Sequence, residues 1–102
     1  MTRDDRVNAL LPVEVEFQKE KAFGLRRTGQ KLEDLLVELA RAEHALKAVQ
    51  GPDRARRFAH YREVRKQAEQ QKWYLMVQRE ACGLRNHRDL DLIYPLPPLV
   101  KE

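Results

Sequence analysis

An apolar stripe with alternating spacings of three and four constrains this chain more than any other feature of its sequence. The stripe runs from Leu25 to Val49, and its members are apolar or small. They are Leu25, Thr28, Leu32, Leu35, Leu39, Ala42, Leu46 and Val49. Because an α-helix repeats about every 3.6 residues, this spacing places the whole stripe on one helix face and is typical of coiled-coil packing. The sequence therefore predicts a long amphipathic helix.

We expect this first helix to cover about residues 13–49, after an N-terminal arm of residues 1–12. Pro12 has no N–H group and suits the first turn of a helix, where that group would have no partner. Gly51 and Pro52 are typical of a helix end. A break between Gly24 and Gly29 stays open as an alternative, because each glycine costs about 1 kcal/mol relative to alanine in a helix.

A second periodic segment predicts another helix over about residues 53–82. Its stripe consists of Tyr61, Val64, Ala68, Gln71, Leu75, Gln78 and Cys82. The polar members Gln71 and Gln78 either fix the register of the helices at a cost in stability or face water where the seam opens. A connection of only two or three residues makes the helices antiparallel. The expected fold is all-α: one domain of residues 1–102, built as a long antiparallel helical hairpin.

The last twenty residues form a different kind of segment, which we call the C-terminal arm (residues 83–102). Its prolines exclude a continuous helix and favour an extended, polyproline-like chain, although a short helical turn is expected over 87–94. The arm is rich in large apolar side chains: Leu90, Leu92, Ile93, Leu96, Leu99 and Val100. We expect the arm to pack against another apolar surface. The spacing of Pro95 and Pro98 also suits a ligand of a proline-recognising domain, so both interpretations stay open.

The hairpin needs a partner, because two helices that share one seam bury little apolar surface. Burial contributes about 25 cal/mol per Å², whereas ordering each residue costs roughly 1.5 kcal/mol. On a helical projection, Trp73 and Val77 lie nearly opposite the seam. The cluster from Trp73 to Val77 must therefore meet the N-terminal segment 7–15, the C-terminal arm or a second copy of the chain. The preferred expectation is a homodimer that forms a four-helix bundle. The expected interface residues are Trp73, Tyr74, Met76, Val77, Leu96 and Leu99.

The net charge of +4 is concentrated in the second helix. A face for nucleic-acid phosphates would use Arg54, Arg57, Arg62, Arg65 and Lys66. Phe58 and Tyr61 fall in the same arc and could stack on bases. The alternative is a solvated face, on which the arginine stems lie over these two rings and the guanidinium groups pair with acids of the first helix.

Catalytic and metal-binding patterns are missing from the sequence. It contains no serine and no glycine-rich phosphate loop. The three histidines, His44, His60 and His87, do not have metal-ligand spacing. Cys82 falls at the end of a predicted helix, where the helix dipole disfavours a thiolate. We expect no enzymatic activity, no cofactor and no metal site.

The sequence also indicates in which cellular compartment the protein is expected. The longest uninterrupted apolar run, Trp73 to Val77, is far shorter than the roughly 18 residues of a membrane span. The N-terminal residues carry no signal-peptide pattern, and a single cysteine is typical of a reducing environment. We expect a cytoplasmic protein with no membrane contact.

The stretch from Trp73 to Arg85, WYLMVQREACGLR, is followed by Tyr94 and by the pair Pro97 and Pro98. This pattern resembles short bacterial helical proteins of an uncharacterised family, over about the last third of the chain. The resemblance implies no activity, cofactor or functional residue. The preferred interpretation is a non-enzymatic helical interaction or adaptor module that acts through homodimerisation and protein–protein contacts. The alternative is a nucleic-acid-binding accessory protein.

Overall fold

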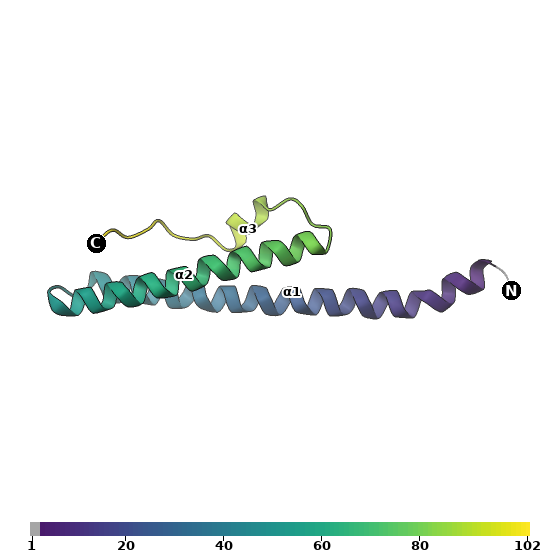
Figure 1. Cartoon of the computed structure of the whole chain (residues 1–102), viewed down its shortest axis with the longest axis horizontal. Helices are drawn as coiled ribbons and strands as arrows, with labels where there is room; N and C mark the ends of the chain where they lie inside the picture. Colours follow the sequence, from purple (N-terminus) through teal and green to yellow (C-terminus); the bar gives the residue numbers. More distant parts are fainter. Residues whose placement is uncertain (1–2) are drawn as a thin grey trace.

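The computed structural model describes the backbone of residues 3–102 and the side chains of residues 15, 16 and 18–102. The chain forms three helices, α1 (Arg3–Lys47), α2 (Pro52–Ala81) and α3 (Arg88–Ile93), and no strand occurs in residues 3–102. Helices α1 and α2 pack side by side as an antiparallel hairpin (Figure 1). The predicted all-α hairpin is therefore confirmed.

Helix α1 begins ten residues earlier than the sequence indicated, at Arg3 rather than near residue 13. Residues 3–12, expected as an N-terminal arm, are part of it. The predicted start at Pro12 was wrong, because a proline inside a helix removes one hydrogen bond but does not prevent helical turns before it. The helix also continues through Gly24 and Gly29, so no break occurs there. Because α1 is much longer than α2, its N-terminal part extends beyond the hairpin (Figure 1).

The connection between the long helices is short and needs a glycine. Gly51 has a φ of +75°, in the left-handed region that side chains rarely adopt, and Pro52 begins α2 directly after it. The Arg54 guanidinium reaches back and donates a hydrogen bond of 3.0 Å to the Leu46 carbonyl. Carbonyl groups in the last turn of a helix have no partner within the helix, so Arg54 stabilises the end of α1.

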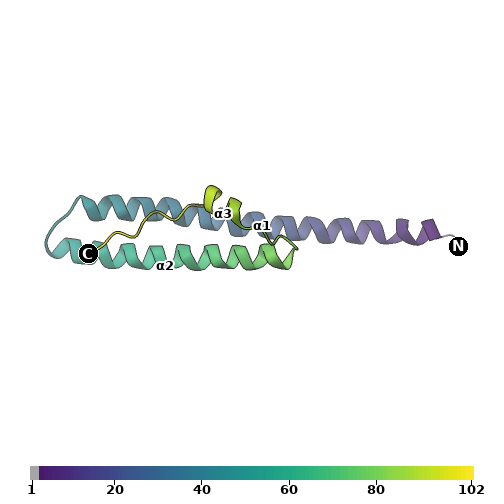
Figure 2. The same ribbon diagram turned by 90° about the horizontal axis from the view of Figure 1, so that it is seen from above.

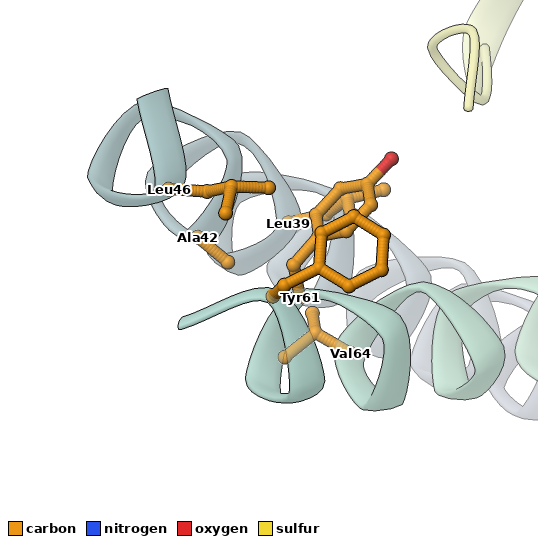
Figure 3. Packing of buried hydrophobic residues seen from close by; sticks show 6 residues of the cluster. Leu39, Ala42, Leu46, Tyr61 and Val64 are labelled. Carbon is orange, nitrogen blue, oxygen red and sulfur yellow. The ribbon is translucent and has the colours of Figure 1, made fainter. Parts of the chain in front are cut away.

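Two clusters of buried side chains fill the space between the helices. The first joins Leu39, Ala42 and Leu46 of α1 to Phe58, Tyr61 and Val64 of α2 (Figure 3). The second joins Leu32, Leu75 and Leu90, one residue from each helix. Apart from Phe58 and Leu90, which belong to neither predicted stripe, these residues follow the predicted stripes, because a three–four spacing on both helices produces a single continuous seam.

The C-terminal arm turns back over the hairpin after α2. Helix α3 confirms the short helix expected over 87–94, and residues 95–102 are neither helix nor strand. In the view of Figure 2 the arm runs between α1 and α2 along much of their shared length. None of the helices in the described part of the chain has both the length and the apolar character needed to cross a bilayer.

Candidate interaction surface

Charged contacts attach the start of the arm to α2. The Arg79 guanidinium donates to both carboxylate oxygens of Asp89, each at 2.9 Å, and the Lys72 ammonium lies 2.8 Å from Asp91. The hydrogen bond from Arg79 is the main reason why the pKa of Asp89 lies below its ordinary value, since it stabilises the ionised carboxylate. These salt bridges orient α3 on the hairpin, together with Leu90, whose side chain is buried in the second core cluster.

Backbone hydrogen bonds attach the end of the arm. Arg65 donates to the Pro97 carbonyl at 2.6 Å, and the Val100 N–H donates to the Tyr61 hydroxyl at 3.0 Å. Leu96 and Val100 also pack against the first core cluster. The side of the seam on which the arm lies is called the front groove below. Its α2 wall consists of Tyr61, Arg65, Lys72 and Arg79.

The other side of the seam has its own groove, which we call the open groove. It measures about 750 Å³ and is lined by Lys31, Leu35, Gln67, Gln70, Gln71, Trp73 and Tyr74. At about 100° per residue, Gln67, Gln71 and Tyr74 fall on the opposite side of the seam from Tyr61 and the other residues that hold the arm. Within the described part of the chain, no hydrogen bond or ion pair joins the arm to this lining.

Large apolar side chains stand exposed at this groove. Trp73 is 62% exposed and Tyr74 is 48% exposed. Val77 does not line the groove; it lies one turn beyond Trp73 on α2 and is 37% exposed. A smaller hollow of about 350 Å³ follows toward the end of α2, where Leu25, Gln78 and Cys82 meet. The open groove and Val77 together are called the open face below.

The six residues expected at a dimer interface are placed in two different surroundings. Trp73, Tyr74 and Val77 belong to the open face. Met76 and Leu96 pack against the core clusters of their own chain, and Leu99 lies exposed on the arm. The sequence reasoning missed the other lining residues: Lys31, Leu35, Gln67 and Gln70. A signal was present, because three glutamines stand close to Trp73 in a chain that is 35% charged.

The two glutamines of the seam differ in their bonding. Gln71 donates from Nε2 to the Thr28 carbonyl at 3.2 Å, across the hairpin. The Oε1 atom of Gln78 is buried without a hydrogen-bond partner. Gln71 therefore supports the register of the helices, whereas Gln78 carries the cost of an unsatisfied polar atom.

The five cations expected on a nucleic-acid face differ in their contacts and in their exposure. Arg54 bonds to Leu46, as described above, and Arg65 bonds to Pro97 and pairs with Glu69 at 3.0 Å. The Arg62 guanidinium lies over the Phe58 ring, 6.0 Å from its centre. Arg57 and Lys66 are exposed.

The two rings of the expected stacking surface lie inside the hairpin. Phe58 is 8% exposed and Tyr61 is fully buried, and both belong to the first core cluster. Neither ring offers a face on which a base could stack.

Among the side chains that the structure describes, no group of three or more His, Cys, Asp or Glu residues is placed to hold a metal ion. His44 and His60 are exposed, while His87 bonds through Nε2 to Glu80 at 3.0 Å. Cys82 is half-buried at the C-terminal cap of α2.

Comparison of the chain with models of protein families, with curated proteins and with solved structures found no match. The resemblance of residues 73–85 to an uncharacterised bacterial family stays a prediction.

Proposed function

We propose that the protein is a non-enzymatic helical interaction module that pairs with a second copy of itself through the open face. The observation that carries the proposal is the exposure of Trp73, 62%, beside a groove of about 750 Å³. Tryptophan and tyrosine are enriched at protein interfaces, because they bury much apolar surface and still form hydrogen bonds.

A second hairpin is the simplest cover for this face. The arm already fills the front groove, so each chain has one groove left between its long helices. A hairpin laid against it would complete a four-helix bundle, the usual way in which helical hairpins bury a second seam. A two-fold axis would place Trp73 and Tyr74 of one copy against the glutamines of the other.

The chemistry of the open groove suits self-association. Its lining contains a single charged residue, Lys31, so two copies can approach with little like-charge repulsion. Its polar members are glutamines and a tyrosine, whose side chains both donate and accept hydrogen bonds. The single cysteine, which cannot form a disulfide within the chain, supports a reducing compartment such as the cytoplasm for this module.

The alternative function is nucleic-acid binding through a single face formed by all five predicted cations. This face has less support than the interaction module. Arg54 and Arg65 form hydrogen bonds within the chain, and the side chain of Arg65 is only 14% exposed. The interaction module is therefore the preferred function.

The test is the mass in solution of a double variant, Trp73→Gln with Val77→Gln. Trp73 lines the groove, and truncating a tryptophan at the centre of an interface costs about 2 kcal/mol or more. We therefore expect the double variant to be a monomer at micromolar concentration. Circular dichroism should show unchanged helix content, because both side chains lie outside the core clusters.

The matched control is Val37→Gln. Val37 is 48% exposed on α1 and belongs neither to the lining of the open groove nor to α2. This variant should keep the mass of the unmodified protein. A double variant that keeps the mass of a dimer would show that the open face is not the interface.

A further inference from the structure

Charge is distributed unevenly along the molecule. Residues 41–66, which end α1, form the connection and begin α2, contain eight Lys or Arg and three Asp or Glu. The rest of the chain contains twelve basic and thirteen acidic residues. The structure is 77 Å long and places residues 41–66 together around the connection, at the end opposite the N-terminus (Figure 1). The positive charge of the protein is therefore concentrated at one end.

Several cations at this end remain open to a ligand. Arg57 and Lys66 are both exposed, and neither forms an ion pair or hydrogen bond with another described side chain. Arg56 pairs with Asp53 at 2.8 Å, but both side chains are largely exposed, and such a pair contributes little stability. Asp53, Arg56, Arg57 and His60 surround a hollow of about 310 Å³. We call Arg56, Arg57, His60, Arg62 and Lys66 the basic tip.

The surroundings of these cations indicate the kind of partner. A membrane-surface site combines cations with apolar side chains that enter the lipid. Among the described side chains, no large hydrophobic residue between positions 41 and 66 is exposed. Arginine guanidinium groups match the geometry of phosphate oxygens and bind them through two parallel hydrogen bonds. A polyphosphate backbone fits the basic tip better than a lipid surface does.

The buried rings indicate which form of nucleic acid fits. Proteins that hold single strands usually stack bases on exposed aromatic side chains. Phe58 and Tyr61 are in the core, so the basic tip has no such platform among its described residues. A contact made of cations alone reads the regular phosphates of a duplex and does not depend on base sequence.

We infer that the basic tip binds the phosphate backbone of duplex nucleic acid. This inference does not depend on the open face, since Arg57 and Tyr74 are seventeen positions apart on α2, about 25 Å along the helix axis. Loss of dimerisation would leave it intact.

The test is fluorescence anisotropy with a labelled 20-base-pair DNA duplex and an RNA duplex of the same sequence. We expect binding at about 50 mM salt that weakens steeply as salt rises. If three or four phosphates are neutralised, the slope of log K against log salt is about −3. Binding that does not change with salt would contradict the inference, as would stronger binding to vesicles with anionic lipids or to a single strand than to the duplexes.

The decisive variant is Arg57→Glu with Lys66→Glu, and the matched control is Arg26→Glu with Arg27→Glu. Both change the net charge equally, but the control residues lie in α1 directly after Leu25, which meets Gln78 and Cys82 at the C-terminal end of α2. The tip variant should lose at least tenfold in affinity and the control no more than about threefold. Equal losses would show that overall charge, rather than the basic tip, drives binding.

Two further measurements control for folding and for charge reversal. Unchanged circular dichroism and unchanged mass would verify that both variants fold. The variant Arg57→Gln with Lys66→Gln repeats the test without reversing the charge.

Discussion

Two glycines of α1 that look alike in the sequence have different surroundings in the structure. A Cβ atom at Gly29 would lie 2.6 Å from the hydroxyl oxygen of Tyr94, so the arm contacts the helix directly there. A Cβ atom at Gly24 would meet nothing within 4 Å. Gly29 thus allows the close approach of the arm, whereas Gly24 has no such role.

Alanine substitutions should separate the two glycines. We expect Gly24→Ala to raise the free energy of unfolding by up to about 1 kcal/mol, because alanine is a better helix former and the space is open. Gly29→Ala should gain less, or lose stability, because Tyr94 must move. Urea denaturation of both variants measures the difference. Equal gains would show that Tyr94 does not press against α1.

For single residues, the sequence predicts which positions are buried but not which long-range hydrogen bonds form. The buried positions Leu39 and Val64 follow from the stripes, because a local spacing decides which side of a helix is apolar. The hydrogen bond from Arg65 to Pro97 joins residues 32 positions apart and depends on where the arm lies. Such contacts cannot be read from local periodicity, which is why Arg65 looked like a free cation.

Among the elements, the C-terminal arm depends most on specific contacts. It reaches the hairpin through salt bridges near α3 and through Tyr61 and Arg65 near its end. An extended segment has no hydrogen bonds of its own to hold it in shape, so these contacts and the packing of Leu90, Leu96 and Val100 against the core clusters keep it in the front groove.

The substitution Tyr61→Phe tests the attachment of the arm. It keeps the buried ring and removes the oxygen that accepts the Val100 N–H. We expect a loss of about 0.5–1.5 kcal/mol in stability and faster hydrogen exchange at Val100, with the helices α1 and α2 unchanged. Unchanged exchange at Val100 would contradict this role of Tyr61.

The attachment of α3 should depend on pH through Asp89. Its pKa is lowered in the folded protein by the hydrogen bond from Arg79, so the folded form binds a proton less readily than the unfolded form. The contribution is complete above the pKa of an unfolded aspartate, about 3.9, and is lost as the pH falls through the lower folded pKa. The stability difference between the unmodified protein and Asp89→Asn should therefore be largest near pH 6 and shrink below pH 4. A difference that stays constant down to pH 2.5 would contradict this.

The two long elements were predictable, but their ends were only partly so. The stripe of α1 and the Gly51–Pro52 pair place the hairpin turn correctly. The N-terminal limit was wrong, because Pro12 lies within α1 and does not start it. Which groove the arm occupies was not predictable, since it depends on contacts such as that between Gly29 and Tyr94, 65 positions apart.

At the scale of the whole molecule, the structure is a narrow rod with one groove covered and one open. It measures 77 Å by 20 Å by 15 Å. The arm closes the front groove (Figure 2), while the open face leaves Trp73, Tyr74 and Val77 exposed. A chain of this shape buries little surface by itself, so the open face is the natural place for a second copy to add stability.

The central claim is that two copies pair through the open face, and sedimentation equilibrium of the unmodified protein tests it most directly. At micromolar concentration we predict a mass twice that of one chain, falling to the mass of one chain only on strong dilution. A well-folded protein with the mass of a single chain at all concentrations up to about 100 μM would contradict the account.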